Sequence, residues 1–267
     1  MVNFEYKEHY DLQDLIEILR ILRGPEGCPW DQVQTHRSNR RNFLEEAYEA
    51  AEAFDQDNPD LMCEELGDML MQVLFNIHIE EDAGRFYTAD VTDRVCKKLI
   101  FRHPHVFGTT EADTPEEVLV HWEKLKKEEK GIHTNADNLD HVARSLPALW
   151  RAEKMQKKAA DAGFDWKDVF GAMDKLEEET VELRRALNGD GDVSEELGDL
   201  LFAAVKVGRF SGIDPEESLH NACEKFLRRF RRVEEAAQQT GQAMNELPLE
   251  QLEEFWANAK TLDLDTL

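Results

Sequence analysis

The sequence contains neither paired cysteines nor a long apolar run. Its four cysteines are scattered and none lies in a C-x-x-C motif, so neither a zinc knuckle nor a dithiol redox site is expected. They are Cys28, Cys63, Cys96 and Cys223. No apolar run approaches the ~20 residues of a membrane span, and the N-terminal residues have no apolar core of the signal-peptide type. We therefore expect a soluble, cytoplasmic protein with reduced thiols and no membrane partner.

Basic residues are also scarce. The chain has 32 Lys and Arg against 57 Asp and Glu, which gives a formal net charge of −25. A surface that binds a nucleic-acid backbone needs clustered Lys and Arg, so we expect no nucleic-acid partner. A small polyanion whose charge is masked by metal ions is still compatible with this composition.

The glycine-rich loops of common nucleotide-binding folds are missing. Nothing in the sequence matches G-x-x-x-x-G-K-S/T, G-x-G-x-x-G or G-x-S-x-G. A Nudix box does not fit, because Asp60-Leu61 stands where Arg-Glu is needed. A ferritin-like di-iron site needs two Glu-x-x-His motifs, and only the stretch from Glu217 to His220 matches one.

Long alternating runs of polar and apolar residues are lacking too, so few strands are expected. Apolar residues instead recur at i, i+3, i+4 and i+7, which predicts amphipathic helices over residues 12–22, 44–54 and 66–77. The fold class predicted from this pattern is all-α.

The most informative feature is an internal repeat. LEEAYEA and EELGD in the first half correspond to LEEETVEL and EELGD in the second. The offsets are 133 residues from Glu46 to Glu179, 131 from Asp68 to Asp199, 127 from Lys98 to Lys225 and 134 from Trp122 to Trp256. This period is too long for a solenoid, and a length of 267 residues suggests two domains. We predict a tandem duplication of one helical-bundle domain, with copies at 1–130 and 145–267 and a linker at 131–144.

Each copy carries two acidic pairs at i, i+3 spacing. The pairs are Glu46 with Glu49, Glu65 with Asp68, Glu179 with Glu182, and Glu196 with Asp199. Helical residues three apart share a face, so two antiparallel helices would set four carboxylates against one another. Such a group is tolerable when it is protonated, solvated or bridged by cations, and oxygen-only ligands favour Mg²⁺ or Mn²⁺.

Glycine and basic residues accompany these acids. Gly67 and Gly198 each interrupt a helix at a cost of about 1 kcal/mol relative to Ala, which suggests close helix approach near the acids. Two basic pairs at i, i+4 spacing suit phosphate oxygens, namely Lys98 with Arg102 and Lys225 with Arg229. Lys175 lies one turn before Glu179, whereas the first copy has Asn42 there, which favours the second copy as the phosphate binder.

The chain resembles the two-domain MazG nucleoside triphosphate pyrophosphohydrolases in an ordered set of motifs: GCPWDQVQTH, LEEAYEA, EELGD, FRHPHVFG and SLPALWRAEKMQKKAADAGFDW. The resemblance covers nearly the whole chain, from about residue 12 to residue 260. It implies an all-α fold whose helical domains pack through a homodimer. It also implies Mg²⁺-dependent cleavage of nucleoside triphosphates between the α and β phosphorus atoms, which yields a nucleoside monophosphate and pyrophosphate.

The same resemblance implies roles for residues at matching positions. The metal ligands would be Glu179, Glu182, Glu196 and Asp199, and the nucleotide would be held by Lys175, Lys225, Arg229, Trp256 and Lys260. The corresponding first-domain site would consist of Glu46, Glu49, Glu65 and Asp68, with Lys98 and Arg102 toward the nucleotide. Either Glu178 or Glu179 would accept the proton of the attacking water.

Two alternative hypotheses stay open. The first is a non-catalytic acidic helical adaptor or nucleotide-sensing regulatory protein, since the net charge would steer a basic partner. It leaves the doubled pattern of acids and bases unexplained. The second is a pyrophosphohydrolase with a narrow substrate range, such as deoxyuridine or deoxycytidine triphosphate, for which the sequence contains no base-reading pattern that we can interpret.

Overall fold

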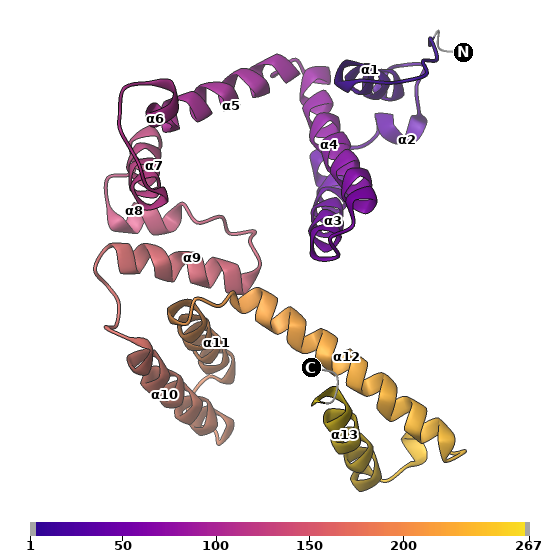
Figure 1. The fold of residues 1–267 in the computed structure, drawn as a ribbon, viewed down its shortest axis with the longest axis vertical. Coiled ribbons are helices and arrows are strands. Elements are labelled where there is room, and N and C mark those ends of the chain that lie inside the picture. Colours follow the sequence, from indigo (N-terminus) through magenta and orange to yellow (C-terminus); the bar gives the residue numbers. More distant parts are fainter. Residues whose placement is uncertain (1–3, 265–267) are drawn as a thin grey trace. The chain divides into compact units, whose positions relative to one another are not determined.

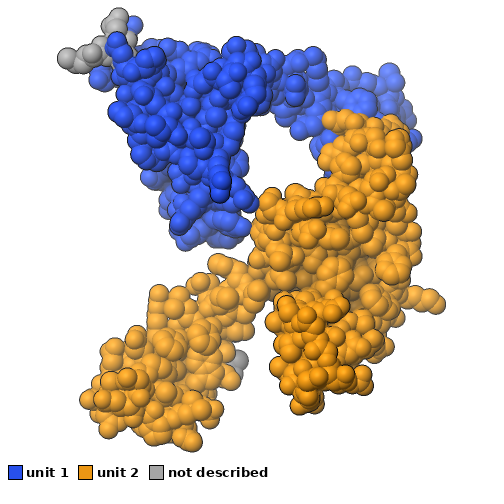
Figure 2. All heavy atoms as spheres, turned by 180° about the vertical axis from the view of Figure 1, so that it is seen from behind, with its two compact units in different colours: residues 1–126 blue, residues 127–267 orange. Residues whose placement is uncertain are grey.

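The computed structural model describes residues 4–264, and within that range it contains helices and no strands (Figure 1). This confirms the all-α prediction. The chain divides into two compact units, residues 1–126 and 127–267 (Figure 2). The first half contains α1 (Leu12–Arg23), α2 (Pro29–Gln32), α3 (His36–Asp55), α4 (Pro59–Asp82), α5 (Thr88–Arg102), α6 (Pro104–Phe107) and α7 (Pro115–Glu129). The second contains α8 (Asn135–Asp140), α9 (Ala148–Asp161), α10 (Val169–Leu187), α11 (Val193–Phe210), α12 (Pro215–Gln239), η1 (Met244–Glu246) and α13 (Leu249–Leu264).

The internal repeat appears in the structure as two copies of one helix order. Helices α3, α4, α5 and α7 carry the first set of motifs, and α10, α11, α12 and α13 carry the second. In each copy the two acidic motifs lie on a pair of packed helices, α3 with α4 and α10 with α11. The tandem duplication is therefore confirmed. None of the helices in residues 4–264 has the length and apolar content that crossing a bilayer requires.

Capping residues fix the ends of the first helical hairpin. Thr35 caps α3 and forms a reciprocal capping box with Ser38, and Asn58 caps α4 ahead of Pro59. Between them Asp57 adopts a left-handed backbone with φ of 49°, which an Asp side chain tolerates in a turn. The short connection obliges α3 and α4 to pack antiparallel.

In the second hairpin, α10 with α11, different residues cap the helices and form the turn. Asp168 caps α10 and Asp192 caps α11, each through a side-chain oxygen that accepts a backbone N–H. The turn between the two helices uses Gly189 and Gly191 at φ of 95° and 130°. Those conformations favour glycine because a Cβ would crowd the backbone.

The best-defined core of the first unit lies between α1 and α4. Ile16 and Leu19 pack on Leu74, Phe75 and Ile77, and all five are buried. This agrees with the apolar spacing predicted over residues 12–22 and 66–77. Most of the apolar residues in the helix predicted over 44–54 are not part of this core. Leu44, Ala51 and Phe54 are exposed on α3.

The segment predicted as a linker, residues 131–144, contains the short helix α8. Its Asn138 is buried and accepts a 2.5 Å hydrogen bond from Lys158 of α9, and Val142 just beyond the helix is also buried. Part of the segment is therefore packed within the second unit. The predicted domain boundaries themselves stay a prediction.

The AGFDW segment, residues 162–166, attaches the start of α10 to α11 through polar and aromatic contacts. Asp165 accepts a 3.0 Å hydrogen bond from Lys206 Nζ and another from Arg209, both on α11. The ammonium of Lys206 also lies 4.8 Å from the centre of the Trp166 ring. A Cβ at Gly171 would sit 2.5 Å from the Trp166 indole, so only glycine lets that ring lie against α10.

Glu81 joins three helices of the first unit. Its carboxylate accepts hydrogen bonds from the Thr88 amide and hydroxyl of α5, each at 2.9 Å, and from Arg20 of α1 at 3.2 Å. His78 lies 2.8 Å away on the same helix, α4. Burial alone would raise the pKa of Glu81, but the hydrogen bonds prevail and lower it to about 2.

We expect acid to weaken this junction. A carboxyl whose pKa is lowered on folding contributes stability that is complete above its unfolded pKa of 4.5 and is lost as the pH falls toward 2. Glu81→Gln should lower the free energy of unfolding by about 2 kcal/mol at pH 6 and make it fall less on acidification. Urea denaturation at pH 6 and pH 3.5 measures both effects.

The matched control for this experiment is Glu45→Gln, which removes an exposed ion pair with Arg41. It should change the free energy of unfolding by less than about 0.5 kcal/mol. An equal loss in the Glu45 and Glu81 variants would show that Glu81 does not hold the three helices together.

Candidate metal and nucleotide site

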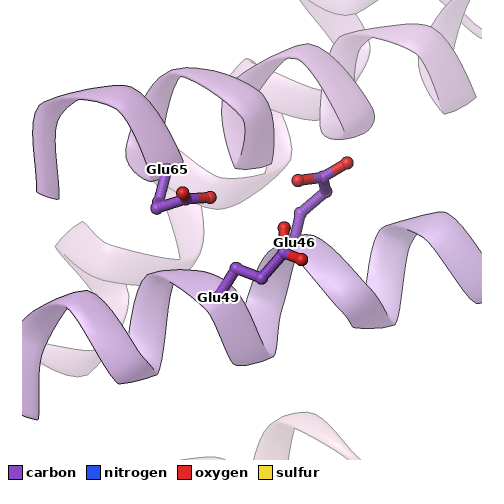
Figure 3. Close-up of side chains that lie close together, drawn as sticks. All are labelled: Glu46, Glu49 and Glu65. Atoms are coloured by element: carbon purple, nitrogen blue, oxygen red, sulfur yellow. The ribbon is translucent and has the colours of Figure 1, made fainter. Parts of the chain in front are cut away.

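The first acidic cluster lies between α3 and α4. Glu46, Glu49 and Glu65 each place a carboxylate oxygen so that all three oxygens lie within 4.8 Å of one another (Figure 3). Figure 3 shows Glu46 and Glu49 on one helix, with Glu65 facing them from the other. The fourth predicted ligand, Asp68, lies outside this group of three, but it is close enough to repel Glu46.

The second acidic cluster lies between α10 and α11, and it gathers a different three of the four equivalent positions. Glu179, Glu196 and Asp199 bring carboxylate oxygens within 4.8 Å of one another. Here the predicted ligand outside the group is Glu182, and it too repels a neighbour, Glu196. Each cluster thus gathers three of its four predicted acids closely, with the fourth within electrostatic range.

Burial and mutual repulsion both act on these carboxyls. Burial raises the pKa of Glu46, Glu65 and Glu196, and the neighbouring carboxylates raise each of them further. A group of acids that repel one another is stabilised when a cation or a proton binds to it, because the repulsion is relieved. The electrostatics of both clusters therefore favour the binding of a positively charged ligand.

The donor atoms fit a hard divalent cation. Both clusters offer carboxylate oxygens alone, which is the ligand type that Mg²⁺ and Mn²⁺ prefer. In the second cluster, Glu179 is 4% exposed and its Oε2 is buried without a hydrogen-bond partner in the described chain. A buried carboxylate oxygen in that state is costly unless a ligand pairs with it.

Lys175 is the basic residue that the structure brings to a cluster. Its Nζ lies 2.6 Å from Glu179 Oε1 and 2.8 Å from Glu178 Oε1. Hydrogen bonds to these two carboxylates raise the pKa of Lys175, so it stays protonated. Glu178 itself is exposed and lies outside the group of three ligands, whereas Glu179 lies within it.

A buried amide chain supports the first cluster, and the sequence-based prediction missed it. Asn39 donates to the Gln72 side chain at 2.8 Å, and Gln72 donates to Glu46 Oε1 at 3.4 Å. Asn39 and Gln72 are 3% and 6% exposed. Spacing within one helix gave no signal for this chain, because it depends on a contact between α3 and α4.

The sequence predicts that the two mid-helix glycines, Gly67 and Gly198, permit close helix approach. Within the described residues this prediction is wrong. A Cβ at Gly67 or Gly198 would meet no heavy atom within 4 Å in the described residues. Neither glycine therefore permits a close approach between the helices of its own hairpin. The acids are brought together by the packing of the helices and not by a glycine contact.

The remaining basic and aromatic residues gather on other helix pairs. Arg102 of α5 is buried, with its guanidinium 5.5 Å from the centre of the Trp122 ring on α7. Arg229 of α12 lies 6.0 Å from the centre of the Trp256 ring on α13. The predicted nucleotide-binding lysines on these helices, Lys98, Lys225 and Lys260, are exposed. The sequence predicts that these basic and aromatic residues contact the same nucleotide as the acidic clusters, and this stays a prediction.

Comparison with known proteins places these motifs in a family. The sequence model of the "MazG nucleotide pyrophosphohydrolase domain" matches residues 34–107 and 170–233. The two matched segments contain the helical hairpins α3–α4 and α10–α11, and with them both acidic clusters.

Relatives with similar sequences extend over almost the full length. The chain is 43% identical over 248 residues to the "Nucleoside triphosphate pyrophosphohydrolase/pyrophosphatase MazG" of Thermotoga maritima, covering 93% of this chain and 95% of that one. It is 41% identical over 256 residues to the "Nucleoside triphosphate pyrophosphohydrolase" of Escherichia coli K12, covering 94% and 97%. The "Uncharacterized protein YabN" of Bacillus subtilis is 42% identical over 255 residues, which cover 94% of this chain and 52% of that protein.

Proposed function

Since the chain belongs to the MazG nucleotide pyrophosphohydrolase family, we propose that it hydrolyses nucleoside triphosphates between the α and β phosphorus atoms. The products would be a nucleoside monophosphate and pyrophosphate. The observation that carries this proposal is the second acidic cluster, where three carboxylates converge beside Lys175. Carboxylates that hold divalent cations, next to a lysine for phosphate oxygens, suit a triphosphate substrate.

We assign cation binding to Glu179, Glu196 and Asp199, with Glu182 beside them. The first cluster, Glu46, Glu49 and Glu65 with Asp68, would hold a cation in the same way. Bound Mg²⁺ supplies charge neutralisation of the phosphate chain and lowers the pKa of a water molecule. Mn²⁺ has the same ligand preference and is the natural substitute.

The chain's own residues would orient the substrate and accept the proton. Glu178 is exposed beside the cluster and is not one of its three close ligands, so it is suited to accept the proton of the attacking water. Lys175, Lys225 and Arg229 would stabilise charge on the departing pyrophosphate. Trp256 and Lys260 would hold the nucleoside end, as Lys98 and Arg102 would for a nucleotide in the first domain.

The test of the metal requirement is the initial rate of pyrophosphate release over a Mg²⁺ titration, with a panel of ribo- and deoxyribonucleoside triphosphates. We expect release that falls to background in EDTA and returns with Mg²⁺ or Mn²⁺. Release that is unchanged in EDTA would contradict the assignment of the clusters. A folded protein that releases no pyrophosphate from any nucleotide would instead favour the acidic adaptor.

We also propose that the functional protein is a homodimer. Both helical hairpins leave apolar side chains exposed on the described chain, and surfaces of this kind in soluble proteins mark interaction sites. The residues concerned are Leu44, Tyr48, Phe54, Leu66, Leu70 and Val73 in the first hairpin and Phe170, Met173, Val181, Leu197, Leu201 and Phe202 in the second. Pairing of each hairpin with a hairpin of a second copy would bury these side chains, and a two-fold axis would close such a dimer.

Sedimentation velocity tests the dimer. The wild-type chain should sediment at about twice its 30.9 kDa mass, and Leu197→Glu/Leu201→Glu should shift it toward 30.9 kDa because buried charge destabilises the interface. The control is Leu249→Glu, which alters a leucine that is even more exposed and lies outside the hairpins. A monomeric wild type, or a double variant that stays dimeric, would contradict the proposal.

A further inference from the structure

The innermost carboxylates of the two clusters are held by different groups. Glu46 and Glu179 occupy equivalent positions in the repeat, 133 residues apart. The partner of Glu46 is the neutral Gln72 amide at 3.4 Å, whereas the partner of Glu179 is the Lys175 ammonium at 2.6 Å. The position equivalent to Lys175 in the first copy is Asn42, which carries no charge.

This difference extends into the core of each hairpin. The amides of Asn39 and Gln72 form a buried chain behind Glu46. At the repeat offsets of 133 and 131 residues the second copy has Ala172 and Ala203, which are also buried. A buried alanine cannot donate a side-chain hydrogen bond, so the second copy has no amide chain at these positions. Its inner carboxylate relies on the lysine.

The Lys175 ammonium puts a positive charge at the position where a bound metal ion would supply it. Its Nζ bridges Glu178 and Glu179, and Glu179 is one of the three close ligands of the second cluster. A divalent cation that entered this cluster would be repelled by the ammonium and would compete with it for the same carboxylate. In the first cluster nothing at Asn42 opposes a cation.

A second observation shows that the lysine does not complete the second site. Glu179 Oε2 is buried and has no hydrogen-bond partner in the described residues, although Oε1 of the same carboxylate is paired with Lys175. The site therefore retains an unmatched acceptor, which a cation would satisfy.

We propose that Lys175 stands in for a divalent cation in the nucleotide-free second cluster and moves onto the triphosphate when nucleotide and cation arrive together. The first cluster, which has Asn42 there, takes up a divalent cation without nucleotide. The two copies thus load metal in a different order. This inference rests on the proposed assignment of the second cluster as the hydrolytic site, and it gives Lys175 a further role, which is to prevent that cluster from filling with metal alone.

Mn²⁺ titration of the full chain, followed by the electron paramagnetic resonance signal of free Mn²⁺, tests the inference without turnover. In the absence of nucleotide we expect one tight site per chain, lost in Glu65→Gln/Asp68→Asn and kept in Glu196→Gln/Asp199→Asn. Lys175→Gln should tighten Mn²⁺ binding at the second cluster by at least about tenfold, because one opposing charge is removed. Addition of α,β-methylene ATP should bring a second Mn²⁺ onto the wild type.

Two further variants sharpen the result. Lys97→Gln is the matched control, because it removes an ion-paired lysine on α5, far in sequence from both clusters, and should leave the Mn²⁺ titration unchanged. Gln72→Met removes the amide that donates to Glu46 while keeping the volume, and should weaken the nucleotide-free site several-fold.

Equal Mn²⁺ binding at both clusters without nucleotide, or no tightening in Lys175→Gln, would overturn the inference. Absence of a tight site in the nucleotide-free wild type would overturn it as well. Pyrophosphate release, measured on the same preparations, separates this from the proposed function. Active protein with the wrong Mn²⁺ pattern refutes the loading order alone, whereas protein inactive toward every nucleotide refutes the hydrolytic assignment.

Discussion

Glu196→Gln/Asp199→Asn is expected to lower pyrophosphate release by at least about a thousandfold, because it removes two of the three close oxygen ligands of the second cluster. Both substitutions are nearly isosteric, and they remove negative charge from a group whose members repel one another. The free energy of unfolding should therefore be unchanged or higher. Loss of turnover without loss of stability distinguishes a missing ligand from a damaged fold.

The control is the equivalent pair in the other copy, Glu65→Gln/Asp68→Asn. The first copy has Asn42 where the second has Lys175, so the control should keep most of the turnover. Initial rates with saturating Mg²⁺ and denaturation curves for both variants provide the comparison. If turnover is lost only in the first-copy variant, the hydrolytic site belongs to α3 and α4.

Asp165→Ala is expected to lower the free energy of unfolding by about 3 kcal/mol. The change leaves Lys206 and Arg209 without the carboxylate that pairs with both, and these two side chains are 7% and 16% exposed. Breaking a buried pair by removing one partner is far more costly than its net contribution, since an uncompensated charge is left behind. Burial opposes the charge on Asp165, but hydrogen bonds from the two cations lower its pKa.

Asp93→Ala is the matched control for that experiment. It removes the carboxylate of an exposed pair with Lys97 at 2.7 Å, and should change the free energy of unfolding by less than about 0.5 kcal/mol. Urea denaturation followed by circular dichroism measures both variants. A loss of similar size in the two would mean that Asp165 does not anchor the start of α10 to α11.

Much of the fold could be predicted from the sequence because helical spacing and the repeat are local or regular signals. The apolar positions over 12–22 and 66–77 identified helices that pack together, through Ile16 and Leu19 on Leu74. The repeat offsets in the sequence pair α3 with α10 and α4 with α11. Regular spacing predicts a helix, but it does not identify the partner that covers its apolar face.

The site was predictable only in outline. Spacing at i, i+3 brought the acids onto one helix face, yet it could not distinguish Asp68 and Glu182 from the three acids that converge in each cluster. The Asn39–Gln72 amide chain depends on contacts between helices, which are not encoded by spacing within one helix. Gly67 and Gly198 show the limit most clearly, because a costly helix residue indicated a close contact that the described part of the chain does not make.

The central claim is the position of the cleaved bond, and product identity tests it most directly. Wild-type protein should be incubated with a nucleoside triphosphate and Mg²⁺, and the products should be separated by anion exchange. The expected result is nucleoside monophosphate and pyrophosphate in equal amounts, with neither product formed in EDTA. Nucleoside diphosphate with orthophosphate would place the cleavage between the β and γ phosphorus atoms and would contradict the account.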